Sequence, residues 1–240
     1  MKLTIGHIYP DILNLYGDKG NIVSLSRRLK LRNIDFEIVI IEDKIDFANI
    51  DILILGGGSD RDTLIANNKL QKQKDELKNF VESDGTLLAL CSGYHILGKE
   101  FKINEKAIDG LGIFDITTKQ IKNRLIGNII LECECINNTV VGFENHNTIT
   151  DIKDYTPFGI VKYGYGNSEE KTYEGLIYKN TIATNLHGPL LPKNPRLTDY
   201  ILNNALNKKY GDVSLSPLDD TFENNAHDYI IKRFLKNSVN

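Results

Sequence analysis

The sequence is poor in cysteine, nearly balanced in charge and free of long apolar runs. Three cysteines in a chain of 240 residues are too few, and odd in number, for a disulfide framework, which fits a reducing compartment. With 29 basic and 32 acidic residues, the net charge of −3 gives no electrostatic footprint for nucleic acid or an anionic membrane. No apolar run approaches the roughly 18 residues that span a bilayer, and the amino terminus lacks the apolar core of a signal peptide. We therefore expect a cytoplasmic protein without a membrane span.

Two nucleotide-binding motifs are also missing. The chain has no Gly-x-x-x-x-Gly-Lys-Ser/Thr phosphate loop and no Gly-x-Gly-x-x-Gly fingerprint at a strand end. A reaction that consumes ATP would therefore take it from another polypeptide. The hydrophobic content of 41% in a chain of this length allows one large core.

The first half alternates short β-branched runs with segments of helical period, the pattern of a mostly parallel sheet covered by helices. Two hairpins are predicted later, around residues 137–138 and 179–180. We expect an α/β fold with a main domain over residues 1–205 and a helical extension over 206–240 packed on it. The predicted strands span 3–8, 36–41, 51–55 and 86–90, and the predicted helices span 21–31, 70–81, 197–206 and 225–235.

Cys91 is the strongest candidate for a catalytic side chain. It follows the strand predicted over 86–90 and precedes Ser92-Gly93, where a helix is expected to begin. A sharp strand-to-helix turn exposes a nucleophile at the carboxyl edge of a sheet, and small neighbours permit the strained backbone. A helix amino terminus and a nearby imidazolium would favour the reactive thiolate. A lone cysteine is more often a core residue, but this position favours catalysis.

Covalent catalysis on an amide also needs a base and donors for the oxyanion. His187 is the best candidate base, because it ends a β-like run and precedes turn-forming residues, although a lone histidine in a turn is more often merely solvated. Gly57 and Gly58 can bring backbone N–H groups close to a substrate, with the Ser92 N–H as a second donor. A glycine run alone could equally be a plain turn or a phosphate cradle.

Together these features resemble a class I, or triad-type, glutamine amidotransferase of the cobyric-acid-synthase-like branch. Within that branch, the chain is most similar to the amidotransferase subunits of lipid II isoglutaminyl synthases. The resemblance implies a flavodoxin-like amidotransferase domain, with a mostly parallel central sheet flanked by helices, over residues 1–205. The stretches that carry it are residues 7–21, 91–98, 124–128, 143–146 and 186–195.

The resemblance also implies roles for single residues. Cys91 would form the glutamyl thioester, and His187 would move the proton. Arg124 would hold the α-carboxylate of glutamine, a task that suits a bidentate guanidinium; without the resemblance it is equally a solvated loop arginine. Asn145 and His146 would lie near the glutamine backbone, although alone they suggest only a polar turn. His95 stands where the family commonly has Gln, so it would either take over that substrate contact or pack on its helix.

A heterodimer is implied as well. A Mur-ligase-like synthetase subunit would bind ATP and Mg and amidate the α-carboxylate of D-glutamate in lipid II, at the inner face of the cytoplasmic membrane. This chain would bind L-glutamine and need no cofactor. The usual triad has a carboxylate two residues after its histidine, but here that position is Pro189. We therefore expect a carboxylate of the partner to complete the site, and glutaminase activity of the free chain to be low.

Other interpretations stay open. The acceptor could be another acid such as a corrinoid, although those enzymes carry their own ATP-binding domain. The chain could also be a cysteine hydrolase of related topology, or a scaffold without activity. Cys133 and Cys135 share one face of a predicted strand, but two thiols without further ligands do not predict a metal site. The sequence leaves four residues after the first strand without a role: Asp11, Tyr16, Asp18 and Lys19.

Overall fold

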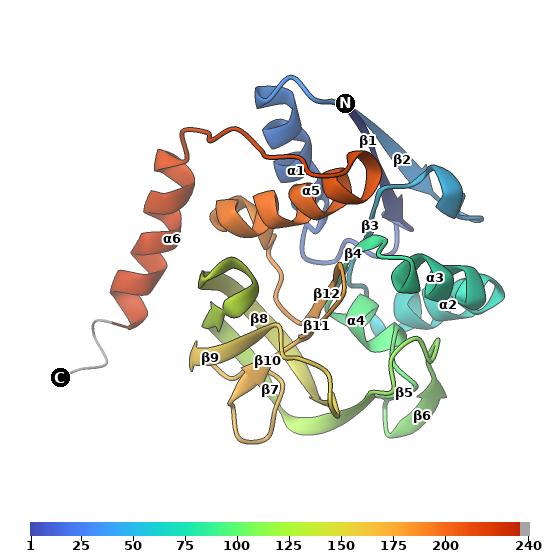
Figure 1. The fold of residues 1–240 in the computed structure, drawn as a ribbon. Helices are drawn as coiled ribbons and strands as arrows, with labels where there is room; N and C mark the ends of the chain where they lie inside the picture. Colours follow the sequence, from blue (N-terminus) through green and yellow to red (C-terminus); the bar gives the residue numbers. More distant parts are fainter. Residues whose placement is uncertain (236–240) are drawn as a thin grey trace.

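The computed structural model of the protein describes residues 1–235. Its centre is a six-stranded sheet in the order β11-β12-β4-β3-β1-β2, in which all neighbours are parallel except β11 and β12 (Figure 1). Every residue of β3 and β4 is buried, because helices cover both faces, and this explains their continuous apolar runs. The predicted mostly parallel sheet is confirmed. Its strands are β1 (Lys2–Ile8), β2 (Asp35–Ile41), β3 (Ile52–Leu55), β4 (Thr86–Leu90), β11 (Leu176–Tyr178) and β12 (Thr181–Thr184).

Helices pack on both faces of the central sheet. Residues of α1 and α5 share one apolar cluster with Ile5 and Leu88, whereas α2 and α3 share the opposite cluster with Leu53 and Leu87. Leu87 and Leu88 thus point to opposite faces, as the two-residue period of a strand requires. The helices are α1 (Lys19–Leu31), α2 (Asp60–Leu70), α3 (Lys74–Glu82), α4 (Ser92–Ile96), α5 (Pro195–Tyr210) and α6 (Thr221–Phe234), with 3-10 turns η1 (Phe47–Asn49), η2 (Gln71–Gln73), η3 (Glu134–Ile136) and η4 (Leu191–Lys193).

The helix predicted over residues 70–81 is wrong at its start. α3 begins at Lys74, and the preceding residues form α2 and the η2 turn. α2 escaped prediction because its sequence is mostly polar and shows little apolar period. The amino terminus of α2 is capped by Ser59, whose side chain accepts a hydrogen bond from the Asp62 N–H.

A second sheet, in the order β10-β9-β7-β5-β6 with β8 paired to β7, lies beside the central one (Figure 1). The predicted hairpins are confirmed as β7–β8 and β11–β12, both antiparallel. The short strands β5, β6, β9 and β10 were not predicted. Two of them, β5 and β9, pair with β7 without a hairpin turn between them, so no turn in the sequence signals the pairing. The strands are β5 (Glu100–Ile103), β6 (Lys106–Asp109), β7 (Thr117–Cys133), β8 (Asn138–Asp151), β9 (Gly159–Tyr163) and β10 (Tyr173–Glu174).

The carboxyl-terminal helix α6 stands at the side of the molecule (Figure 1). His227 anchors it, because one ring nitrogen lies 2.8 Å from Thr139 Oγ1 and the other 2.9 Å from the Lys193 carbonyl oxygen. The predicted boundary between residues 205 and 206 falls inside α5, and the division into a domain and an extension stays a prediction. Within residues 1–235, no helix has the length and apolarity needed to cross a membrane.

Candidate active site

Three neighbouring strands bring the predicted catalytic segments to one edge of the central sheet. β3, β4 and β12 are parallel, so their carboxyl ends lie side by side. The glycine loop over 56–58 follows β3, Cys91 follows β4, and His187 comes shortly after β12. The His187 N–H also donates to the Phe143 carbonyl oxygen at 3.0 Å, which ties this edge to β8 of the second sheet.

Cys91 occupies the strained turn that its position predicted. Its φ of 52° and ψ of −121° lie outside the regions common for residues with a side chain. The Cys91 N–H donates to the Thr184 carbonyl oxygen at 2.8 Å, which holds the turn against β12. A Cβ on Gly57 would lie 2.8 Å from the Cys91 Cβ and 3.4 Å from its Sγ, so only glycine permits this close approach.

A pocket of about 240 Å³ opens in front of Cys91. This volume is on the scale of an amino acid rather than of a drug-sized ligand. His187 and Gly57 do not line it: His187 lies under Tyr16, and Gly57 packs against the Cys91 side chain. The predicted site residues that line the pocket are Gly58, Cys91, Ser92, His95, Arg124, Asn145 and His146.

Arg124 reaches this pocket from an irregular stretch of β7. The pairing of β7 with β8 shifts register between Gln120 and Leu125, and such bulges re-aim side chains next to active sites. The Arg124 Nε donates to Asn145 Oδ1 at 2.6 Å, and one Nη donates to the Asn145 carbonyl oxygen at 3.4 Å. Neutral groups therefore orient the guanidinium, which leaves its charge for a ligand carboxylate.

His95 and His146 belong to a polar network at the floor of the pocket. The His95 Nε2 lies 2.8 Å from Asn185 Oδ1 and 3.4 Å from Thr148 Oγ1. The His146 Nδ1 lies 3.1 Å from the Thr148 carbonyl oxygen, and its Nε2 lies 3.6 Å from Glu144 Oε2. Burial lowers the pKa of His95 to about 4, so this ring is neutral near pH 7.

His187 is buried against aromatic rings. It stacks on Tyr16 with ring centroids 3.9 Å apart and an angle of 9° between the planes, and Phe143 lies at 6.0 Å. Neither ring nitrogen has a hydrogen-bond partner among the described residues. Burial lowers the pKa of His187 to about 4, so the ring is neutral near pH 7 and able to accept a proton.

The expected activation of Cys91 as a thiolate is not found in this conformation. α4 has only five residues, and the neutral His187 supplies no imidazolium. Burial raises the pKa of Cys91 to about 12, and the nearby Asp18 carboxylate adds to this rise. The thiol is therefore protonated near pH 7, so its proton must leave as the sulfur attacks.

Neither glycine N–H expected at the oxyanion is free. The Gly57 N–H donates to Asp18 Oδ2 at 2.9 Å, and the Gly58 N–H donates to Ser92 Oγ at 3.0 Å. The Gly57 carbonyl oxygen is also engaged, because it accepts from the Leu15 N–H at 3.0 Å. The glycine loop is thus bonded on both sides by other parts of the chain.

The sequence assigned no role to three residues at or near the site, and two of them, Asp18 and Glu174, are fully buried carboxylates. Tyr16 covers His187 and Asp18 holds the glycine loop, and the only signal for either was its position after the first strand. Glu174 is fully buried, and its Oε1 accepts from the Asn185 N–H at 2.6 Å and from Thr184 Oγ1 at 2.8 Å.

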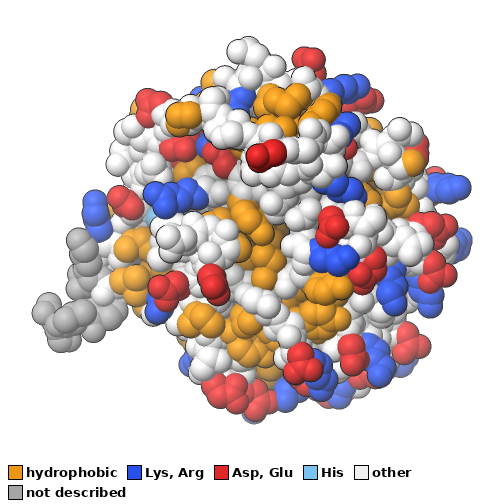
Figure 2. Space-filling model, viewed as in Figure 1, with side chains coloured by type: hydrophobic (Ala, Val, Ile, Leu, Met, Phe, Trp, Pro, Cys, Tyr) orange, Lys and Arg blue, Asp and Glu red, His pale blue; other side chains and the backbone are white. Residues whose placement is uncertain are grey.

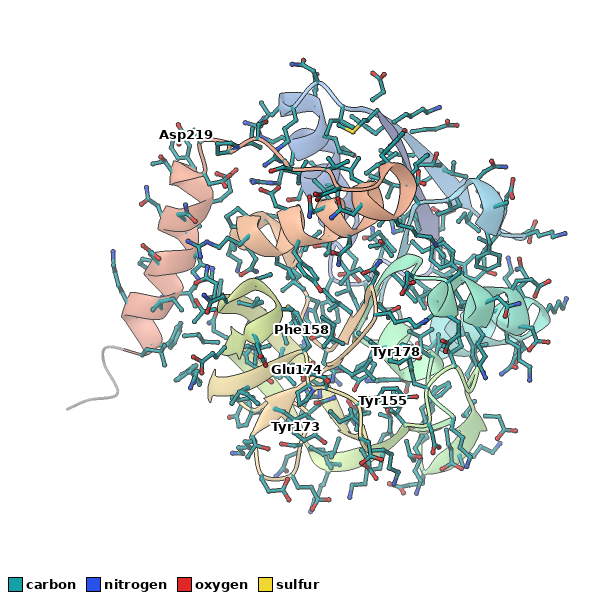
Figure 3. The ribbon with its side chains drawn as sticks, viewed as in Figure 1. Tyr155, Phe158, Tyr173, Glu174, Tyr178 and Asp219 are labelled. Carbon is teal, nitrogen blue, oxygen red and sulfur yellow. The ribbon has the colours of Figure 1, made fainter. Side chains whose placement is uncertain are left out.

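Glu174 stabilises the backbone that leads to His187. Figure 3 places it beside Phe158 and Tyr173, where β10 meets the central sheet. Nothing in the local sequence of β10 signalled a buried acid, because its neighbours along the chain are of mixed polarity.

The surface formed by residues 1–235 carries a second, larger groove of different chemistry. Acidic and basic side chains are interspersed over the face seen in Figure 2, around patches of apolar side chains. A larger groove of about 1000 Å³ runs along β2 and the end of α5, but no cysteine or histidine lines it. Within the part of the chain that the structure describes, no cluster of three His, Cys, Asp or Glu side chains could hold a metal ion.

The chain is similar to known proteins over most of its length. The model of the CobB/CobQ-like glutamine amidotransferase domain matches residues 4–195. The chain is 42% identical to the lipid II isoglutaminyl synthase (glutamine-hydrolyzing) subunit GatD of Staphylococcus aureus, over 97% of this chain and 96% of that protein. It is 38% identical to the subunit of the same name from Streptococcus pneumoniae, over 91% and 86%. It also superposes on a crystal structure of a glutamine amidotransferase with a TM-score of 0.59 and 19% identity, over 84% of this chain and 98% of the other.

Proposed function

Because the chain belongs to the CobB/CobQ-like glutamine amidotransferase family, with the flavodoxin-like fold predicted for it, we propose that it hydrolyses L-glutamine to glutamate and ammonia. The observation that carries the proposal is that Cys91 and Arg124 line the same small pocket. A nucleophile on a strained turn and a guanidinium that forms no ion pair within residues 1–235 suit a substrate that has an amide at one end and a carboxylate at the other.

We assign the two catalytic roles to Cys91 and His187, as expected for a triad-type amidotransferase. The Cys91 sulfur attacks the side-chain amide carbon of glutamine, and His187 takes the thiol proton and delivers it to the leaving nitrogen as the C–N bond breaks. Ammonia departs and a glutamyl thioester remains. Water then attacks this thioester, His187 accepts a proton from the water and returns it to the sulfur, and glutamate is released.

The ammonia is passed to a synthetase subunit. The two relatives from Staphylococcus aureus and Streptococcus pneumoniae are named as glutamine-hydrolysing subunits of a lipid II isoglutaminyl synthase, and this chain covers 96% and 86% of their lengths. The partner is a Mur-ligase-like chain that binds ATP and Mg and amidates the D-glutamate α-carboxylate of lipid II. This acceptor would place the complex at the inner face of the cytoplasmic membrane.

The partner also supplies the missing carboxylate of the triad. Pro189 stands where the carboxylate is usually found, and both ring nitrogens of His187 are without a hydrogen-bond partner among residues 1–235. The stacking on Tyr16 holds the plane of the ring, but an imidazole without a hydrogen-bonded carboxylate is a poor base, because its tautomer is not fixed. The free chain should therefore hydrolyse glutamine slowly, and the partner should raise the rate.

The test is reconstitution with the Mur-ligase-like subunit. The two chains are incubated with lipid II, ATP, Mg and glutamine, and conversion of the lipid's acid to an amide is followed by mass spectrometry. We expect amidation with the native chain and none with Cys91→Ala, and we expect free ammonia to restore it in the variant. Cys135→Ala is the matched control, because that half-buried cysteine lies away from the pocket.

Other outcomes separate the remaining interpretations. Glutamine hydrolysis without amidation would keep Cys91 as the nucleophile and point to a different acceptor, such as a corrinoid acid. A Cys91 that is not labelled by 6-diazo-5-oxo-L-norleucine, a glutamine analogue, would point to a hydrolase for other substrates or to an inactive scaffold. A fast rate in the free chain, unchanged by the partner, would refute the proposal of a shared triad.

A further inference from the structure

The edge of the central sheet at β2 is open to solvent. β2 is the last strand in the order of the sheet and pairs only with β1, so its outer side has no strand partner within residues 1–235. Ile38 and Ile40 on this edge are 42% and 51% exposed. Proteins normally cover or charge such an apolar edge, because it would otherwise pair with another chain. The β2 edge is therefore apolar surface that residues 1–235 leave uncovered.

A groove of about 450 Å³ runs between this edge and α1. Phe36, Ile38 and Ile40 form its wall on β2, because residues two positions apart point to the same side of a strand. Val23 of α1 lines the groove as well and is 60% exposed. Exposed apolar side chains that gather in one place mark an interaction site more often than scattered ones do.

The rim of the groove carries charge of one sign. Lys19, Arg27 and Lys30 of α1 line it and are exposed, whereas no acidic side chain among residues 1–235 lines it. None of these three cations forms an ion pair in that part of the chain. The whole chain has a net charge of −3, so three unpaired cations in one groove depart from its average surface. A protein surface that fits the groove is therefore apolar at its centre and acidic at its flank.

The groove lies one helix away from the catalytic histidine. α1 forms one side of the groove, and its first turn also contacts the segment that follows His187. A Cβ on Gly20 would lie 2.5 Å from Pro189 Cγ, and Asn21 Oδ1 accepts from the Leu191 N–H at 2.9 Å. An α-helix with its side chains is about 10–12 Å wide. A protein seated in the groove therefore lies within about one helix width of the segment that carries His187.

We propose that this groove is the docking site of the synthetase subunit, which lays an apolar segment with acidic flanking residues along β2. This inference rests on the proposed function, in which the partner receives the ammonia and completes the triad. An acidic surface held by the cations of α1 would also present carboxylates near His187, where the triad lacks one. A second copy of this chain fits less well, since a two-fold contact along β2 would bring the cations of one copy against those of the other.

Binding of the purified Mur-ligase-like subunit by the full chain tests the charged rim. The dissociation constant is measured by isothermal titration calorimetry at about 50 and about 500 mM NaCl. Arg27→Glu/Lys30→Glu reverses two rim charges. Lys74→Glu/Lys78→Glu on α3 is the matched control, because it makes the same change in net charge with exposed residues on the opposite face of the sheet.

We expect the α1 variant to raise Kd at least about tenfold at the lower salt concentration, because like charges would then meet at the rim. The increase should be smaller at the higher concentration, since salt screens exposed charges. The α3 variant should bind as the native chain does.

Ile40→Thr tests the apolar wall. Threonine keeps the β-branched shape that suits a strand but removes apolar area that docking would bury. Kd should rise about fivefold at both salt concentrations, because the burial of apolar surface is not screened by salt. Ile160→Thr is the matched control, since Ile160 is 48% exposed, lies on β9 of the second sheet and does not line the groove.

Labelling of Cys91 by 6-diazo-5-oxo-L-norleucine in the free chain separates this inference from the proposed function. All variants should label at the native rate, because none of the substituted residues lines the pocket in front of Cys91. Native labelling with a native Kd in both groove variants would overturn the docking site and leave the glutaminase intact. A native chain that resists the label would instead refute the glutaminase function, whatever the binding shows.

Two further results would overturn the docking site. One is a native chain that labels but does not bind the Mur-ligase-like subunit. The other is a native chain that forms dimers in sedimentation velocity, which the groove substitutions convert to monomers, because the groove would then belong to a second copy of the chain.

Discussion

Replacing Asp18 with Asn should stabilise the protein, and by an amount that depends on pH. The folded state raises the pKa of this carboxyl from 3.8 to about 6. Between those values the folded state binds more protons than the unfolded state, so this group makes stability fall as pH rises from about 4 to 6. At pH 7 the ionised carboxylate destabilises the fold by about 3 kcal/mol, since each pKa unit corresponds to about 1.4 kcal/mol.

Asn has no proton to lose and keeps the acceptor oxygen. The variant should therefore match the native chain near pH 4 and exceed its stability by about 3 kcal/mol above pH 7. For a chain of this length that difference raises Tm by about 6–12 °C. Urea unfolding followed by circular dichroism at pH 4.5, 5.5, 6.5 and 7.5 measures the difference directly.

Asp43→Asn serves as the control, because that side chain is 90% exposed and its replacement should shift stability little at any of these pH values. An Asp18→Asn variant that is less stable than the native chain at pH 7.5 would contradict the reasoning. A stability difference that does not grow between pH 4.5 and 7.5 would contradict it as well.

The remaining predictions concern the pocket and its neighbours. The rate of Cys91 alkylation by iodoacetamide should keep rising beyond pH 10 in the folded chain, because burial raises the pKa of Cys91 to about 12, and a plateau near pH 8.5 would contradict this. Arg124→Lys and Arg124→Ala should both raise KM for glutamine, the latter by about 10- to 100-fold, since a bond to a charged carboxylate is lost; steady-state kinetics with an unchanged KM would count against the assigned role. Tyr16→Phe should keep kcat near the native value because the ring still stacks on His187, whereas Tyr16→Ala should lower it by about tenfold; equal rates would show that the stacking does not matter.

The nucleophile and the sheet could be read from the sequence because their signals are local. A continuous apolar run predicts a strand buried on both faces, and the small residues after Cys91 predict a sharp turn. Both features depend on residues within a few positions of one another. The predicted strand over 86–90 accordingly agrees with β4.

The electrostatics of the site could not be read in this way. A helix end and an imidazolium were expected to favour the thiolate, but α4 is short and His187 is neutral. The neutral state of His187 depends on burial, which depends on how distant segments pack. The pKa of Cys91 therefore lies opposite to the expectation from its sequence neighbours.

By itself, the sequence determined the α/β class, the positions of the strands at the centre of the sheet, the position of Cys91 on its turn and the presence of Pro189 where a triad carboxylate usually stands. Only the tertiary structure decided that Asp18 bonds Gly57 and that Tyr16 covers His187, and it alone brought Arg124 to the pocket on a β-bulge. The physical reason is the separation along the chain over which each interaction acts. Periodicity and turn chemistry act over a few residues, whereas the bond from Gly57 to Asp18 joins residues 39 positions apart, and such contacts exist only once the chain has packed.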